Sequence, residues 1–164
     1  RKGLGPRREG TRPERGRQAI GVALGPRLTT ADDAKVRVGP APPLLCHDET
    51  VAVPAAIAAS AAGRLALPRG DSGLDLQGLM KYLAAQQYNE ILVESGPRLA
   101  GALLQAGLLD ELIVYMSPAL LGDRARPLLA LPLDKMAVKV QLQWEDVRKV
   151  GTDWCFTAIP VRSS

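Results

Sequence analysis

Residues 89–115 read "NEILVESGPRLAGALLQAGLLDELIVY" and hold two apolar runs on either side of a Gly-Pro turn and a helical segment. The apolar run at 90–94 indicates a buried strand, and Gly96-Pro97 indicates a turn into a helix that ends just before Gly107. Residues 111–116 indicate a second strand. The question is whether Glu94 and the turn after it bind a ligand or only connect two elements.

Ligands of parallel α/β sheets gather where strands end and helices begin. If Pro97 is the first helical residue, the amides of Arg98, Leu99 and Ala100 point out of the helix with a partial positive charge, which suits a phosphate. Gly96 would let a ligand approach the backbone, and Gly101 would leave room against the sheet or a cofactor. Helix starts that bind nothing share these features, with Glu94 as a cap and Arg98 as a solvated residue. The residues alone leave both interpretations open.

The flanking sequence supplies further elements. Strands are expected at 19–24, 43–47 and 64–68, and helices between Pro54 and Gly63 and at 76–83. Asp75 is placed to cap the second of these helices, while Pro54 suits the first turn of the other and Gly63 its C-terminal cap. Near the C-terminus, Val138, Val140, Leu142 and Trp144 alternate with polar residues, and Gly151-Thr152 precedes another apolar run. This pattern predicts an antiparallel hairpin with one solvated face.

Composition and charge narrow the class of protein. A chain of 164 residues that is 46% hydrophobic has the size of one folded domain. The net charge of +4 comes from the first seventeen residues. These hold Arg1, Lys2, Arg7, Arg8, Arg12, Arg15 and Arg17 against Glu9 and Glu14. We therefore expect a basic, disordered arm at 1–18 and a domain at 19–164, and we do not expect nucleic-acid binding by that arm to be the function.

The cysteines and the single histidine indicate no metal site. Cys46 and Cys155 lie far apart, without a CxxC pair or a cluster of histidines, so we expect two buried thiols in a reducing compartment. His47 is expected to be a strand-end residue. No stretch is long and apolar enough for a membrane span, and no signal peptide is recognised. A cytoplasmic location follows as an expectation.

A longer motif carries a family resemblance. The segment "ILVESGPRLAGALLQAGLLDELIVYMSPALLGDRARPLLALP" contains an aliphatic strand, Val-Glu-Ser-Gly-Pro, a helix, Asp-Glu-Leu and a Pro-x-Leu-Leu-Gly loop, in that order. It resembles the C-terminal reductase domain of the bifunctional riboflavin-biosynthesis deaminase/reductase. Weaker similarity extends from about residue 17 to 159. The resemblance implies a dihydrofolate-reductase-like α/β fold, a three-layer sandwich with a mostly parallel sheet and a C-terminal antiparallel hairpin.

The resemblance also implies a function. It implies reduction by NADPH of 5-amino-6-(5-phosphoribosylamino)uracil to the ribitylamino compound, by a homodimer. Glu94 would contact the pyrimidine substrate, and the cofactor would bind to Gly96, Pro97, Arg98, Leu99, Ala100, Gly101 and Ala102. No side chain is expected to act as a catalytic nucleophile or metal ligand, because NADPH carries the chemistry of hydride transfer.

The chain departs from the family pattern in three places. Gly25-Pro26 stands where members have Asp-Ser, whose Ser contacts the cofactor, and Ala119 stands where Lys is common. The family's N-terminal strands, which flank the strand equivalent to 90–94, have no counterpart in residues 1–18. We therefore expect a fragment, or a truncated or misframed product, whose strand at 90–94 lacks neighbours. The alternative to a working reductase is a non-catalytic remnant that keeps a nucleotide-binding turn.

Overall fold

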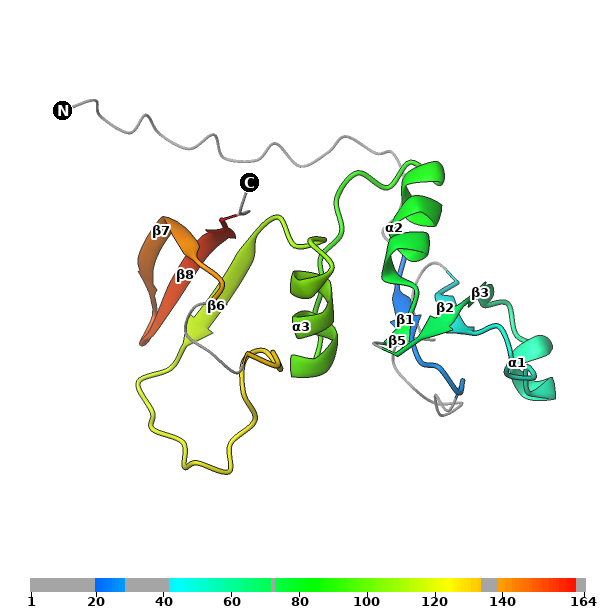
Figure 1. The fold of residues 1–164 in the computed structure, drawn as a ribbon, viewed down its shortest axis with the longest axis horizontal. Coiled ribbons are helices and arrows are strands. Elements are labelled where there is room, and N and C mark those ends of the chain that lie inside the picture. The colour runs from blue at the N-terminus through cyan, green and yellow to red at the C-terminus, as the bar shows by residue number, and fades with distance from the viewer. Residues whose placement is uncertain (1–19, 29–41, 72, 134–138, 162–164) are drawn as a thin grey trace. The chain divides into compact units, whose positions relative to one another are not determined.

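A computed structural model describes residues 20–28, 42–71, 73–133 and 139–161. The arm expected at 1–18 lies outside the described residues. The chain divides into two compact units, Arg1–Arg69 and Gly70–Ser164 (Figure 1). The expected single domain over 19–164 stays a prediction.

The first unit is built on a parallel sheet. Its strands β1 (Val22–Leu24), β2 (Leu44–Asp48) and β3 (Gly63–Leu67) lie in the order β1-β2-β3. The central strand β2 is buried at every position, as expected for an aliphatic strand covered on both faces. All three predicted strands are thus confirmed, with shifts of one to three residues at their ends.

The core of the first unit forms where a short helix meets this sheet. Helix α1 (Ala55–Ala58) contributes Ile57, which packs with Leu28 and Leu45. Around these three buried residues lie the partly buried Ala23, Val53 and Ala62. Burial of such aliphatic side chains stabilises the folded unit.

Two details predicted for this helix are wrong. Pro54 has an extended ψ of 143° and is the N-cap, one residue before the helix. Gly63 does not cap the helix but begins β3, and its amide donates to the carbonyl of Pro43 at 2.8 Å. Helix α1 ends at Ala58, and Arg64 Nη1 donates to the carbonyls of Ile57 and Ala58, each at 3.1 Å, which satisfies carbonyls of the last turn.

The second unit begins with a small ladder and a well-capped helix. At the junction of the units, β4 (Arg69–Gly70) pairs with β5 (Gly73–Leu74), and α2 (Leu76–Ala85) follows. Asp75 Oδ1 accepts the amide of Gly78 at 2.9 Å, which confirms the predicted cap. The predicted helix is also confirmed, and Leu79 and Leu83, buried one turn apart, give it an apolar face.

Asp75→Ala is expected to lower the free energy of unfolding of the second unit by about 1 kcal/mol, because the Gly78 amide loses its acceptor. Urea unfolding followed by circular dichroism measures this loss. Asp71→Ala, which removes an exposed carboxylate a few residues earlier, is the matched control. Equal stability of the two variants would contradict a role for the cap.

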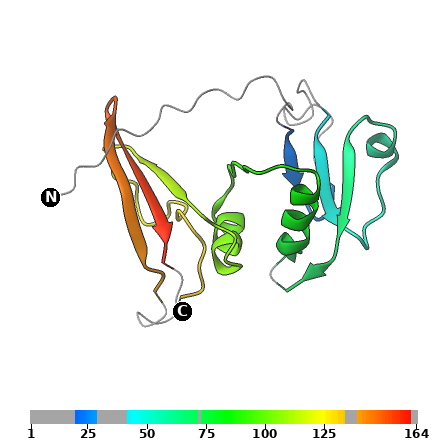
Figure 2. The same ribbon diagram turned by 90° about the horizontal axis from the view of Figure 1, so that it is seen from above.

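An antiparallel sheet and one helix complete the second unit. The strands β6 (Leu112–Met116), β8 (Asp153–Pro160) and β7 (Leu142–Val150) lie in the order β6-β8-β7, and α3 (Pro97–Gln105) lies beside β6 on one side of the sheet (Figures 1 and 2). The predicted hairpin with its turn at Gly151 is confirmed, and Gly151 has the positive φ of 62° that favours glycine. Cys155 and Thr157 of β8 are buried in this unit.

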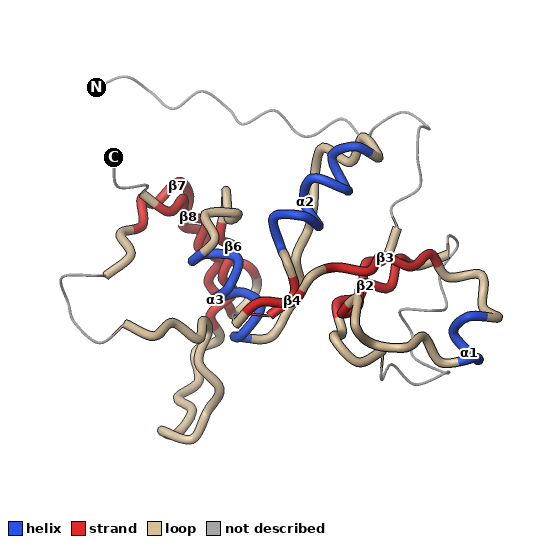
Figure 3. The backbone as a smooth tube through the Cα atoms, turned by 45° about the vertical axis from the view of Figure 1, so that its right-hand side comes forward, coloured by secondary structure: helices blue, strands red, loops and turns tan. Residues whose placement is uncertain are grey.

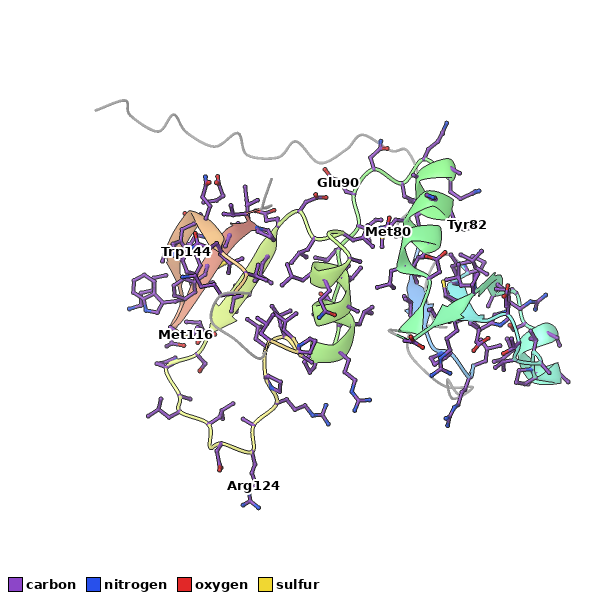
Figure 4. All side chains as sticks on the ribbon, in the orientation of Figure 1. Met80, Tyr82, Glu90, Met116, Arg124 and Trp144 are labelled. Atoms are coloured by element: carbon purple, nitrogen blue, oxygen red, sulfur yellow. The ribbon has the colours of Figure 1, made fainter. Side chains whose placement is uncertain are left out.

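The hairpin has the expected solvated positions, since Gln143 and Arg148 of β7 are exposed, but its other face also carries exposed apolar side chains. The strand register aligns Trp144 with Ala158 and Ala158 with Leu112, so these side chains share a face. Trp144 is 59% exposed and projects from the sheet on the side away from α3 (Figure 4). An irregularity between Trp144 and Asp146 breaks the predicted alternation, and Val138 lies outside the described residues.

The strand predicted at 90–94 is not formed. The segment between α2 and α3 is a loop in the structure (Figure 3). Ile91, Leu92 and Val93 are 44%, 82% and 39% exposed. The physical reason is that a strand exists only as part of a ladder, and this segment pairs with no strand among the described residues. The expected lack of neighbours therefore appears as loss of the strand itself.

Candidate functional site: the start of helix α3

The start of α3 presents backbone donors. Gly96 is the N-cap and Pro97 is the first helical residue, and no side chain caps the helix. The amide of Ala100 donates to the carbonyl of Gly96 at 3.2 Å, so the expectation of three outward amides is wrong for that residue. The amides of Arg98 and Leu99 have no acceptor among the described residues. Two donors at the positive end of the helix dipole therefore remain for a ligand.

The space and charge around these donors suit an anion. A Cβ at Gly96 would have no atom within 4 Å, so the N-cap backbone is open to a ligand. Gly96 has a φ of −75°, which any residue adopts, so openness and not backbone conformation distinguishes this position. Arg98 is exposed and adds a positive charge one residue into the helix. Such an arrangement can hold a phosphate by hydrogen bonds and charge.

Glu94 lies two residues before the N-cap and is exposed. Because the strand beneath it is not formed, its position is set by the chain leading into Gly96 and not by a sheet. Its carboxylate offers acceptors for N–H groups of a ligand bound beside the helix start. The Glu94 carboxylate, which accepts hydrogen bonds, thus lies four residues before Arg98, whose amide can donate one.

Other predicted site residues have contacts within the protein. Gly101 is buried, and a Cβ there would lie 3.0 Å from the carbonyl carbon of Ala130 and closer still to its oxygen. The carbonyl of Ala102 accepts the amide of Ala106 at 2.9 Å. The room expected at Gly101 for a cofactor is therefore filled by the chain itself.

The contact with Ala130 was not predicted from the sequence. Besides meeting Gly101, the backbone of Ala130 donates its amide to the carbonyl of Pro97 at 2.9 Å. The only signal in the sequence is the apolar run 128–131, whose Leu129 and Leu131 are partly buried. A loop that uses backbone groups for its contacts leaves no recognisable side-chain motif.

A second polar group of residues lies in the first unit, at the carboxyl end of β2. Asp48 Oδ1 accepts Thr50 Oγ1–H at 2.7 Å and the Thr50 amide at 2.9 Å, and Arg69 Nη1 lies 3.8 Å from Oδ2. These bonds from Thr50, more than the charge of Arg69, hold the pKa of Asp48 below its usual 3.8. His47 is buried and its Nδ1 donates to the Asp48 carbonyl at 2.9 Å. The carboxylate is already engaged, so this group holds the strand end.

Because the pKa of Asp48 is lower in the folded than in the unfolded chain, its contribution to stability is present above about pH 4 and is lost as the pH falls further. Thermal melting between pH 5 and about pH 2.5 is expected to show a shallower acid decline for Asp48→Asn than for the unchanged chain. Glu49→Gln, which alters the exposed neighbouring carboxylate, is the control. If the melting temperatures of Asp48→Asn and of the unchanged chain fall equally steeply with pH, this role of Asp48 is contradicted.

The cysteines are structural. Both are buried and free, as expected, and burial raises the pKa of the Cys46 thiol to about 11. In the described part of the chain, no three His, Cys, Asp or Glu side chains are grouped so as to hold a metal ion. The described helices are also too short or too polar to cross a membrane.

Comparison with known proteins identifies the family. A family model described as the RibD C-terminal domain matches residues 4–156. This chain belongs to the RibD C-terminal domain family. The expected family is therefore confirmed over nearly the whole chain.

Relatives of this RibD C-terminal domain include whole RibD proteins and a separate reductase. The riboflavin biosynthesis protein RibD of Escherichia coli is 54% identical over 92 residues, which are 56% of this chain and 25% of that protein. The 5-amino-6-(5-phosphoribosylamino)uracil reductase of Buchnera aphidicola is 33% identical over 82 residues, 49% of this chain and 39% of that protein. The chain thus spans only a part of the relatives that it matches.

Solved structures agree on the fold. RibD of Acinetobacter baumannii superposes with a TM-score of 0.75 at 28% identity, over 85% of this chain and 37% of that one. The riboflavin biosynthesis reductase of Saccharomyces cerevisiae gives a TM-score of 0.66 at 17% identity, over 86% of this chain and 69% of that one. The expected dihydrofolate-reductase-like α/β class, with a parallel sheet and antiparallel strands, is confirmed for this RibD C-terminal domain.

Proposed function

We propose that this chain is an NADPH-dependent reductase domain that converts 5-amino-6-(5-phosphoribosylamino)uracil to the ribitylamino compound. The observation that supports it most is the open start of α3, where the amides of Arg98 and Leu99 lack an acceptor among the described residues, in a member of the RibD C-terminal domain family. The name of the Buchnera relative supplies the substrate. An oxidoreductase of riboflavin biosynthesis is the broader class to which this activity belongs.

The residues at the helix start fit a phosphate group of NADPH. Open space at Gly96 admits it, the amides of Arg98 and Leu99 are placed to donate to it, and the guanidinium of Arg98 adds charge. When bound, NADPH supplies the hydride for the reduction. Pro97, Ala100 and Ala102 contribute by building the helix turn, since their backbone groups bond within the protein.

Glu94 is the proposed substrate contact. A pyrimidine carries ring and exocyclic N–H donors, and an exposed carboxylate two residues before the cofactor turn can accept them. Such a contact orients the ribosylamino carbon relative to the cofactor, and orientation is the main contribution that a protein makes to hydride transfer. No protein nucleophile or metal ion is part of the proposal.

One observation favours a second candidate, a non-catalytic remnant with a nucleotide-binding turn. Ile91, Leu92 and Val93 are exposed next to the proposed site and pair with no strand of the described residues, so no described sheet supports Glu94. Such a remnant would bind NADPH without reducing anything.

The purified chain, mixed with NADPH and the ribosylaminopyrimidine phosphate, tests both candidates. Loss of NADPH absorbance together with a raised melting temperature in NADPH supports the reductase. A raised melting temperature without turnover supports the remnant. If NADPH is neither oxidised nor raises the melting temperature, both candidates are contradicted. Binding to DNA that is lost on deleting residues 1–18 would favour a nucleic-acid function instead.

We propose a homodimer, and the exposed apolar face that carries Trp144 is the kind of surface that associates. Sedimentation equilibrium of the purified chain measures this, and a monomer at micromolar concentration would contradict it. The two buried, unpaired cysteines support a reducing compartment such as the cytoplasm.

A further inference from the structure

The backbone of Ala130 contacts one face of α3 at two points. Its carbonyl lies against Gly101, where a Cβ would be 3.0 Å from the carbonyl carbon and 3.3 Å from the amide nitrogen. Its amide donates to the carbonyl of Pro97 at 2.9 Å. Pro97 and Gly101 are four residues apart and therefore lie one above the other on the helix.

Only glycine permits this contact. The carbonyl oxygen of Ala130 is closer to the Cβ position of Gly101 than real Cβ atoms approach a backbone atom, so a side chain there would push the loop away. The atoms that would have to move belong to the backbone of Ala130 and not to the flexible end of a side chain. The absence of a Cβ at Gly101 thus allows the Ala130 amide to reach Pro97.

The bond to Pro97 acts on the turn that carries the free amides. Pro97 is the first residue of α3, and Arg98 and Leu99 follow it in the same turn. Helix ends fray because their backbone groups lack helical partners, and no side chain caps this one. A hydrogen bond from Ala130 to the first carbonyl holds the turn from outside the helix.

We propose that Gly101 is a positioning residue for the cofactor: by admitting Ala130 to the helix face, it fixes the first turn of α3 so that the Arg98 and Leu99 amides point at the bound phosphate. This rests on the proposed NADPH site. Gly101 does not contact the cofactor itself, because the side on which a Cβ would stand is occupied by Ala130. Family resemblance placed Gly101 among the cofactor contacts, and its burial assigns it a different role.

Gly101→Ala tests this role. Alanine is the better helix former, so the substitution would stabilise α3 if Ala130 were not in the way. We expect the reverse: a lower melting temperature, faster hydrogen exchange at the Ala130 amide, and NADPH binding weakened about tenfold, as measured by nucleotide fluorescence well below the melting temperature. Faster exchange reports loss of the bond to Pro97 whether or not NADPH binds.

Two controls separate positioning from stability. Gly122→Ala is a glycine-to-alanine change in the loop that contains Ala130, at a position where a Cβ would meet no atom within 4 Å. It is expected to alter neither the melting temperature, nor the exchange at Ala130, nor the NADPH affinity. Leu103→Ala removes a buried side chain from the same helix and is expected to lower the melting temperature with NADPH affinity unchanged. A merely structural role for Gly101 would give the Leu103→Ala result.

The outcomes are distinct. Faster exchange at Ala130 with unchanged NADPH affinity overturns the positioning role. Unchanged exchange overturns the contact itself. If the unchanged chain binds no NADPH, the proposed function fails and positioning fails with it, while the exchange at Ala130 still shows whether Gly101 holds the loop to Pro97.

Discussion

Glu94→Gln is expected to lower kcat/KM for the ribosylaminopyrimidine phosphate about 100-fold, which corresponds to roughly 2.7 kcal/mol of transition-state stabilisation. Glutamine keeps the size of the side chain but loses the charge and one acceptor, so an N–H group of the substrate is left poorly paired. Steady-state NADPH oxidation at saturating cofactor measures the change. The Kd for NADPH should not change, because the proposed phosphate contacts are the amides of Arg98 and Leu99 and not Glu94.

The chain offers a matched control for this variant. Glu90→Gln changes the other glutamate of the same exposed segment, which Figure 4 labels on the loop between α2 and α3, and should retain full activity. Equal losses in the two variants would mean that the segment as a whole, and not the carboxylate of Glu94, affects turnover. Full activity of Glu94→Gln would mean that the Glu94 carboxylate does not contribute to substrate binding.

Arg98→Glu is expected to weaken NADPH binding about 30-fold, or roughly 2 kcal/mol. The change replaces an attractive charge beside the phosphate with a repulsive one. Because an acidic residue in the first turn interacts favourably with the positive end of the helix dipole, the melting temperature of the free chain should not fall. Titration of NADPH by fluorescence measures the affinity.

The control for Arg98→Glu uses an arginine away from the helix start. Arg124 projects from the loop between β6 and β7, away from α3 (Figure 4), and Arg124→Glu makes the same change of charge. Its NADPH affinity should stay within about twofold of the unchanged chain, and the difference between the two variants should shrink as salt is added. Equal losses of NADPH affinity in the two variants would indicate a general charge effect. Unchanged affinity in Arg98→Glu would mean that Arg98 is a solvated surface residue without a role in NADPH binding.

The sequence predicted the elements that are stabilised by local or neighbouring residues. Asp75 caps α2 through its own side chain, and Gly107, with a φ of 67°, ends α3 as its position indicated. The hairpin β7–β8 formed because its two strands are adjacent in the chain and joined at Gly151. Each of these signals lies within a few residues of the structure that it specifies.

Two features that depend on distant parts of the chain were not predicted. The run 90–94 has the composition of a strand, but a strand also needs a partner, and its own residues do not specify one. Gly101 was recognised as a place of close approach, yet which group approaches it depends on the path of a loop thirty residues later. At the site, the open N-cap could be inferred from Gly96-Pro97, whereas the role of Ala130 could not.

Titration of the isotope-labelled chain with NADPH, followed by amide resonances, shows directly where the cofactor binds. We expect the amides of Arg98 and Leu99 to show the largest shifts, with a single Kd that matches the fluorescence titration, because they are the described donors at the helix start without an acceptor among the described residues. Ala100, whose amide bonds to Gly96, should shift less. Saturable binding with the Arg98 and Leu99 resonances unmoved would contradict the assignment of the cofactor to the start of α3.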